Sequence, residues 1–108
     1  MFSKEELIAQ LRAMNAPRDS VVLVHSSLKA IGETEDRGQG VLDALIEYFT
    51  AEGGLFCVPT HTWDRLGTDK ITLDLTENES NLGAFAKVAM EDGRGIRSEN
   101  PTHSVIVF

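Results

Sequence analysis

The chain has 108 residues, which is enough for one domain with one hydrophobic core. Hydrophobic residues make up 42% and charged residues 25%, a composition typical of a soluble globular domain and unlike that of a disordered chain. The formal net charge of −7 argues against nucleic acid as a partner, because phosphates select a basic surface, but it permits a cationic ligand. No apolar run is long enough to span a bilayer and no secretory signal is visible, so we expect a cytoplasmic protein without a membrane partner.

The single cysteine, Cys57, fits a reducing compartment because it offers no disulfide framework. It stands between Phe56 and Val58 in a strand pattern. Thiols in apolar surroundings are inert, so we expect a buried structural thiol and not a reactive one.

The first predicted element is a helix that begins at Ser3. Ser3 and Glu6 have the spacing of a capping box, in which the serine side chain bonds the first turn and the glutamate reaches back. Apolar residues then recur at helical spacing up to Met14, and Pro17 predicts the end of the helix. Residues 21–24 form an apolar run without alternation, which predicts a short strand covered on both faces.

A second helix is predicted over residues 40–51, with Gly53 at its C-terminal cap. Its predicted apolar face consists of Val41, Leu42, Leu45, Ile46 and Phe49. The next strand is predicted over residues 55–58 and ends at Pro59. Residues 60–80 show no clear period, and a loop of that length in a compact domain is usually functional or carries short elements.

A third helix is predicted over residues 82–91, with Gly93 as its stop. Its predicted inner face consists of Phe85, Ala89 and Met90. Residues 105–108 predict a last strand, and the alternation of helices and strands indicates an α/β fold. Three strands and three helices make a thin sheet with exposed edges, so we expect residues 1–108 to be the N-terminal part of one longer domain.

All three histidines lie in hydroxyl-rich segments next to the ends of predicted strands. These segments are residues 25–28 (His-Ser-Ser-Leu), residues 59–63 (Pro-Thr-His-Thr-Trp) and residues 101–104 (Pro-Thr-His-Ser). Sites in α/β folds are usually built at strand ends, so three such segments invite one common explanation. The first segment either holds an amide or phosphate oxygen with Ser26, Ser27 and free backbone N–H groups, or it is a satisfied turn.

The segment that begins at Arg97 offers further chemistry. Its guanidinium can clamp a phosphate or carboxylate with paired donors, and Ser98 can add a hydroxyl. Asn100 precedes a proline, which forces an extended or turned backbone there. The alternative is a solvated loop with an exposed arginine.

Two common kinds of site do not fit the spacing. No Gly-x-Ser-x-Gly motif surrounds Ser26 or Ser27, so no serine hydrolase elbow is predicted. The histidines are 36 and 42 residues apart and there is no second cysteine, so we expect no metal. The glycines of residues 38–40 and 93–95 match no Walker or dinucleotide motif and are interpreted as turn glycines.

Five segments in order nevertheless form a pattern that covers nearly all of the chain. They are residues 24–28 with Ile31 and Gly32, residues 40–45, residues 54–55 leading into 59–63, residues 83–86, and residues 97–105. Together they resemble about the first half of a member of the aminoglycoside 3-N-acetyltransferase family. No single segment is specific, and the resemblance depends on their order.

The resemblance implies a three-layer α/β/α fold, here with an incomplete sheet flanked by helices. It also implies an antibiotic-resistance acyltransferase that uses acetyl-coenzyme A as donor. The implied acceptor is the 3-amino group of a polycationic aminoglycoside. Such a transfer needs a base for the amine, a positioned thioester and donors for the developing oxyanion.

The resemblance also assigns residues. Those expected to bind coenzyme A are His25, Ser26, Ser27, Leu28, Arg97, Ser98, Thr102, His103 and Ser104. Those expected near the acceptor, where carboxylates can pair with ammonium groups, are His61, Trp63 and Asp64. The general base is expected beyond Phe108, and His61 is the candidate for it within the chain.

Several points stay open at this level. The family often has a Gly-Gly pair where this chain has Gly38-Gln39-Gly40, so the turn geometry there is not fixed. The acceptor is open to being another small amine, and the chain to being a non-catalytic remnant that binds coenzyme A weakly or only folds. A phosphate-binding enzyme such as a phosphohydrolase is a more distant alternative. The sequence predicts no oligomeric state, and residues 1–108 alone are expected to be inactive.

Overall fold

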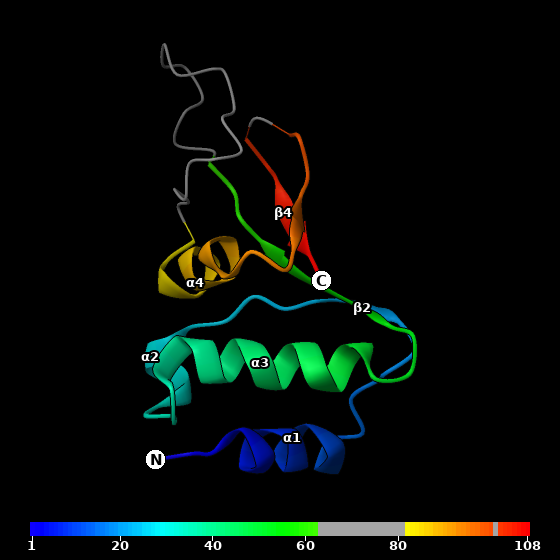
Figure 1. The fold of residues 1–108 in the computed structure, drawn as a ribbon, viewed down its shortest axis with the longest axis vertical. Helices are drawn as coiled ribbons and strands as arrows, with labels where there is room; N and C mark the ends of the chain where they lie inside the picture. Colours follow the sequence, from blue (N-terminus) through cyan, green and yellow to red (C-terminus); the bar gives the residue numbers. More distant parts are fainter. Residues whose placement is uncertain (63–81, 101) are drawn as a thin grey trace.

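The structure is a computed structural model that describes residues 1–62, 82–100 and 102–108 (Figure 1). Its helices are α1 (Lys4–Ala13), α2 (Leu28–Ile31), α3 (Arg37–Thr50) and α4 (Ala84–Asp92). Its strands are β1 (Val21–Leu23), β2 (Leu55–Pro59), β3 (Ile96–Arg97) and β4 (Val105–Val107). The predicted α/β alternation is confirmed. The elements that periodicity missed, α2 and β3, have only four and two residues, too few to show a period.

The sheet is mixed and has the strand order β1-β2-β4-β3. β1 pairs with β2 in parallel, and β4 pairs antiparallel with both β2 and β3. Parallel neighbours need a crossover, which α2 and α3 supply between β1 and β2. Because β4 runs opposite to β2, the segment that precedes β4 lies beside the segment that follows β2. This brings the surroundings of His103 next to those of His61.

α1 starts as predicted. The Ser3 N–H donates to Glu6 Oε2 at 2.8 Å, and the Glu6 N–H donates to Ser3 Oγ at 3.1 Å. The helix ends at Ala13, before Pro17 is reached, because Asn15 adopts a left-handed φ of 55° that a helix cannot continue. None of its residues is fully buried, and it lies against α3 on the side away from the sheet (Figure 1).

α3 carries most of the core. It begins at Arg37, three residues before the predicted start, so Gly38 and Gly40 lie in its first turn and not in a preceding loop. A Cβ at Gly40 would collide with the Glu35 carbonyl oxygen, so this close approach requires glycine. The core cluster consists of Val41, Leu42, Leu45, Tyr48, Phe49, Phe56, Val58, Phe85, Ala89 and Ile106. Ile46, predicted to face the core, is only half-buried.

Glycines follow the ends of two helices, as predicted. Gly53 has a φ of 84° and donates its N–H to the Thr50 carbonyl at 3.3 Å, just after α3. Gly93 caps α4 with a left-handed φ of 90°. The buried residues of α4 are Phe85, Ala86 and Ala89, whereas Met90, predicted to face inward, is half-buried.

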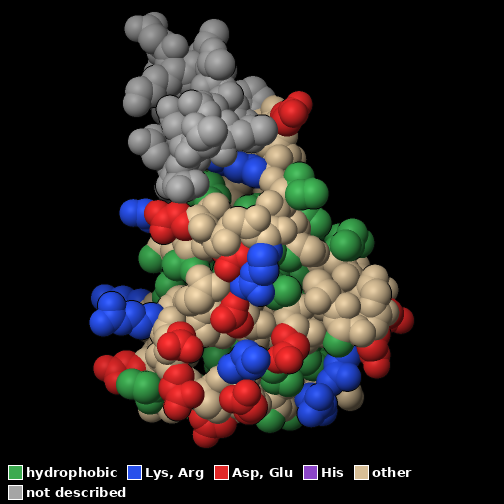
Figure 2. All heavy atoms as spheres, viewed as in Figure 1, with side chains coloured by type: hydrophobic (Ala, Val, Ile, Leu, Met, Phe, Trp, Pro, Cys, Tyr) green, Lys and Arg blue, Asp and Glu red, His purple; other side chains and the backbone are tan. Residues whose placement is uncertain are grey.

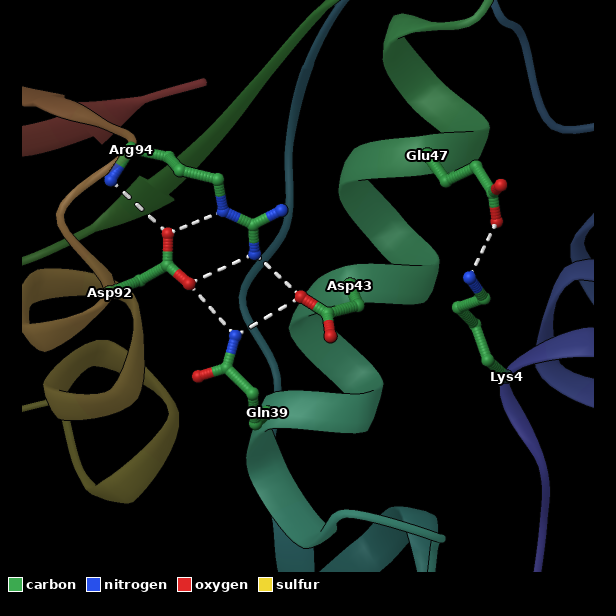
Figure 3. Close-up of polar contacts among 6 residues, drawn as sticks. All are labelled: Lys4, Gln39, Asp43, Glu47, Asp92 and Arg94. Carbon is green, nitrogen blue, oxygen red and sulfur yellow. Dashed lines mark hydrogen bonds and ion pairs between the residues drawn. The ribbon is translucent and has the colours of Figure 1, made fainter.

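A charged cluster, the Arg94 cluster, ties the end of α4 to the first half of α3 and consists of Gln39, Asp43, Asp92 and Arg94 (Figure 3). Arg94 Nε donates to Asp92 Oδ1 at 2.7 Å, and its Nη2 donates to Asp43 Oδ1 at 2.5 Å. Gln39 Nε2 donates to both carboxylates, at 3.0 Å to Asp43 and 2.8 Å to Asp92. The Arg94 side chain is the main cause that lowers the pKa of Asp92 to about 2.

The two faces of the sheet differ in what covers them. α3 and α4 pack on the face formed by Phe56, Val58 and Ile106, each at most 3% exposed. The opposite face, called the outer face, carries Val21, Leu23, Leu55 and Ile96, which are 71%, 59%, 47% and 79% exposed. The expectation that residues 21–24 are covered on both faces is therefore wrong for the described part of the chain, where β1 is an edge strand with one covered face.

Cys57 lies on β2 and is 8% exposed. Burial raises the pKa of its thiol, which keeps the thiol protonated and unreactive. The expectation of a buried structural cysteine is confirmed.

Charged side chains on the face seen in Figure 2 are interspersed, with acidic and basic groups alternating over the helical part of the molecule. The described acidic side chains seen on this face are therefore divided by basic ones and form no single patch there. Among the described helices, none has the length and apolar character needed to cross a membrane.

Candidate functional site

The two similar histidine segments lie side by side and extend the β2–β4 ladder. A backbone hydrogen bond flanks the histidine pair on each side, from Thr60 to Ser104 at 2.9 Å and from Thr62 to Thr102 at 2.7 Å. His61 and His103 therefore stand opposite each other at a non-hydrogen-bonded position, where cross-strand side chains come closest. Their ring centroids are 5.0 Å apart and the rings are tilted by 58°.

The surroundings of His61 lower its pKa. Burial lowers its pKa, and the neighbouring His103 and then His25 lower it further. The influence of His25 means that the third histidine lies in the same neighbourhood. A lowered pKa keeps the His61 ring neutral at physiological pH, and a neutral imidazole has a lone pair that can accept a proton.

A buried polar cluster, the Arg97 cluster, lies on the other side of the same strand ends and consists of Arg97, Thr60 and Ser104. Thr60 and Ser104 are both 0% exposed. Arg97 Nε donates to Ser104 Oγ at 3.0 Å, and Arg97 Nη2 donates to the Thr60 carbonyl at 3.2 Å. The Ser104 hydroxyl donates to the same carbonyl at 2.9 Å. Its only proton is thereby used, so the Thr60 hydroxyl is the donor in the 2.9 Å bond between the two hydroxyls.

His103 is held in a tight turn. Asn100 Oδ1 accepts the N–H groups of Thr102 at 3.0 Å and His103 at 2.7 Å, which is the arrangement of an Asx turn. Thr102 Oγ1 lies 2.7 Å from His103 Nδ1. Ser98 Oγ accepts the Val105 N–H at 2.9 Å, so this hydroxyl fixes the start of β4.

A cavity of about 490 Å³ opens beside His25, between the starts of α2 and α4. Its lining residues are His25, Ser26, Ser27, Leu28, Lys29, Leu82, Gly83, Ala84 and Phe85. Ser27 caps α2 by accepting the Ala30 N–H at 3.4 Å. Within the described residues no side chain caps α4 at Gly83, so its first backbone N–H groups are suited to an anionic or carbonyl oxygen.

The family model for aminoglycoside 3-N-acetyltransferases matches residues 23–108, which include all three histidines. The chain belongs to this family. No curated protein sequence matches the chain closely enough to count as a relative.

Solved structures of the family fold cover nearly the whole chain. YokD from Bacillus subtilis is 20% identical, with a TM-score of 0.84, and the match covers 98% of this chain and 49% of YokD. A mutant of the aminoglycoside acetyltransferase AAC(3)-IVa in complex with apramycin is 26% identical, with a TM-score of 0.82 and coverages of 98% and 42%. AAC-IIIb in a binary complex with CoASH is 18% identical, with a TM-score of 0.75 and coverages of 98% and 45%. The expected fold class is confirmed, and the chain spans less than half the length of each of these proteins.

The residues that the resemblance assigned to coenzyme A form two groups. The first group lines the cavity and consists of His25, Ser26, Ser27 and Leu28. The second group lies on β3 and in the segment between β3 and β4, and consists of Arg97, Ser98, Thr102, His103 and Ser104. None of the second group is among the described residues that line the cavity. Its role in binding coenzyme A stays a prediction.

The residues assigned to the acceptor are only partly described. His61 contacts His103 of the second group, and His25 of the first group is among the causes that lower the pKa of His61. Trp63 and Asp64 lie outside the described residues. Their roles, like that of His61, stay predictions.

Sequence reasoning gave no role in this site to three of its features: Lys29, the start of α4 at Gly83, and Thr60. Lys29 stands two residues after Ser27, and a serine before a short apolar stretch is a helix start that could have been recognised. Nothing local reveals that Thr60 bonds a serine 44 residues away. Across the described ranges no group of three or more His, Cys, Asp or Glu side chains is arranged to hold a metal ion.

Proposed function

We propose that residues 1–108 form the N-terminal portion of an acetyl-coenzyme A-dependent N-acetyltransferase that acts on the 3-amino group of an aminoglycoside. The observation that carries this proposal is the convergence of three histidines at one end of the sheet, beside a cavity, in a chain of this family. The apramycin complex of AAC(3)-IVa supports an aminoglycoside acceptor, and the CoASH complex of AAC-IIIb supports the donor.

The cavity beside His25 suits part of the coenzyme A arm. Its volume of about 490 Å³ lies in the range usual for small-molecule sites. Ser26 and Ser27 offer hydroxyls to amide groups of the arm, while Lys29 and the backbone N–H groups at the start of α4 offer positive charge to its anionic groups. The apolar part of the lining, with Leu28 and Phe85, can pack against the methylene groups of the arm.

The transfer itself breaks the C–S bond of the thioester, forms an amide C–N bond and releases coenzyme A as a thiol. The attacking amine must lose a proton, and a neutral imidazole is suited to accept it. His61 is the described residue whose lowered pKa best fits that task. We assign the principal base to the part of the domain that this chain does not span, and His61 to the mouth of the amine site with Trp63 and Asp64.

The outer face supports the proposal that the domain is longer than this chain. An apolar sheet face with residues exposed by 47% to 79% is costly in water, because full burial of an aliphatic side chain contributes about 1.5–3 kcal/mol and these side chains obtain only part of it. The matches cover only 49% of YokD and 42% of AAC(3)-IVa, so more than half of each of these chains lies outside the matched part. We propose that the remaining portion of the domain covers the outer face, with the histidine end of the sheet at its border.

Calorimetry with coenzyme A tests the donor site. The wild-type chain should release or take up heat at millimolar ligand, and Lys29→Gln should weaken binding about 3- to 10-fold by removing one charge from the cavity. Lys87→Gln is the matched control, because Lys87 lies on the exposed side of α4 in a pair with Glu91. A folded wild-type chain that gives no heat would favour a non-catalytic remnant.

An acetyltransferase assay tests the position of the base. With acetyl-coenzyme A and an aminoglycoside, residues 1–108 should show no turnover above background. Turnover that disappears in His61→Ala would place the base within the chain and overturn this part of the proposal. A chain that binds coenzyme A, but binds aminoglycosides no more tightly than other small amines, would favour a different acceptor.

A further inference from the structure

We infer that Arg97 is a positioning residue for the histidine pair, because its guanidinium bonds the Thr60 carbonyl and Ser104 Oγ and so fixes the two chain segments that carry His61 and His103. The inference rests on the proposed function only in treating these two histidines as site residues. The hydrogen bonds on which it depends all join described residues.

On the β2 side, the bonded carbonyl belongs to the peptide group that also contains the His61 nitrogen. Peptide groups are planar, so a carbonyl held in one direction also fixes the orientation of the following N–H and Cα. Two donors hold the Thr60 carbonyl, Arg97 Nη2 at 3.2 Å and the Ser104 hydroxyl at 2.9 Å. The backbone of His61 is thereby fixed from the opposite face of the strand.

On the β4 side, Ser104 directly follows His103. Its carbonyl accepts the Thr60 N–H at 2.9 Å, and its Oγ accepts Arg97 Nε at 3.0 Å. One planar guanidinium therefore bonds both segments at once, in each case next to a histidine. The backbone bonds on each side of the pair bring the ring centroids to 5.0 Å, and the guanidinium braces the two segments beside it.

Because the partners of Arg97 are buried, the support depends on the shape of the guanidinium and not only on its charge. Thr60 and Ser104 are 0% exposed, so water has no access to replace a missing donor. The pKa of His61 is lowered by burial, His103 and His25, and the Arg97 charge is not among these causes. A lysine would keep the charge but would lose the planar fork that reaches two acceptors.

Arg94 provides a matched control three residues earlier in the chain. Its guanidinium bonds the carboxylates of Asp92 and Asp43, at the junction of α3 and α4 (Figure 3). None of these bonds involves the strand ends that carry the histidines. Arg94→Lys therefore makes the same chemical change in a different support.

The test is an NMR titration of the imidazoles in residues 1–108. The wild-type chain should show a nuclear Overhauser effect between the rings of His61 and His103 and a pKa of His61 below that in an unfolded peptide. In Arg97→Lys the inter-ring effect should be lost and the pKa of His61 should shift upward, because the ring becomes more hydrated. In Arg94→Lys both should stay as in the wild type.

The inference is overturned if Arg97→Lys folds, as judged by its backbone amide spectrum, and keeps both the inter-ring effect and the pKa of His61. If Arg97→Lys does not fold, Ser104→Ala takes its place, since it removes the hydroxyl that accepts from Arg97 Nε and donates to the Thr60 carbonyl, and so weakens the support of both segments. A folded Ser104→Ala with unchanged histidine signals also overturns the inference. These NMR measurements need neither coenzyme A nor an acceptor, so they test the role of Arg97 independently of the proposed function.

Discussion

Two arginines three residues apart support different parts of this molecule with different partners. Arg94, whose side chain is 51% exposed, bonds the carboxylates of Asp92 and Asp43 and joins helix to helix. Arg97 bonds neutral oxygens of Thr60 and Ser104, both 0% exposed, and joins the ends of two strands. The Arg94 cluster depends on charge and is accessible to salt, whereas the bonds of Arg97 to Thr60 and Ser104 depend on hydrogen-bond geometry. Arg94 stabilises the packing of α4 on α3, and Arg97 stabilises the segments that carry His61 and His103.

The largest effect is expected from removing the hydroxyl at the centre of the Arg97 cluster. Ser104→Ala removes three hydrogen bonds at once, and the Thr60 hydroxyl and Arg97 Nε each lose a bond in a buried place. We expect the free energy of unfolding to fall by about 2–3 kcal/mol, measured by urea denaturation. Ser20→Ala is the control, because the Ser20 hydroxyl makes one exposed bond of 3.4 Å and its loss should cost less than about 0.5 kcal/mol. Equal losses in the two variants would contradict the contrast between buried and exposed bonds.

An intermediate effect is expected in the Arg94 cluster. Arg94→Gln removes the main partner of Asp92, whose side chain is only 7% exposed. The free energy of unfolding at pH 7 should fall by on the order of 1–2 kcal/mol, less than the full pKa shift implies because Arg94 is half-exposed.

The pH dependence of the same variant sharpens the comparison. The pKa of Asp92 is about 2 in the folded protein against an ordinary 3.8. The stability it contributes is therefore complete above pH 3.8 and is lost as the pH falls toward 2. Arg94→Gln should lose less stability over this interval than the wild type, as measured by urea denaturation at several pH values. Salt at 1 M should weaken the wild-type contribution of Arg94 and leave that of Ser104 unchanged.

Local signals predicted those parts of the fold that depend on a few neighbouring residues. The capping box at Ser3 and the left-handed glycine at Gly93 were recognisable because each acts within one helical turn. The two strand-end histidine segments were also recognisable, but their pairing was not, because the antiparallel direction of β4 is set by contacts far apart in sequence. For the same reason no local signal shows that Arg97 bonds the Thr60 carbonyl, 37 residues earlier in the chain. The predicted role of Arg97 in binding coenzyme A stays a prediction.

The smallest effect is expected at His61, and it distinguishes burial from charge at the histidine end. Its folded pKa lies below the ordinary 6.5, so the folded protein binds this proton more weakly than the unfolded chain does. Stability should therefore be complete above pH 6.5 and should decrease as the pH falls from there toward the folded pKa. His61→Asn should reduce this decrease, as measured by denaturation between pH 7.5 and about pH 5.

Because burial is the largest cause and the two neighbouring histidines are smaller ones, most of the wild-type pH dependence should persist in 1 M salt, where the screening length is only about 3 Å. Its disappearance in salt would show that the histidines act on one another mainly through charge, and the close approach of the two rings would then matter more than the burial of His61.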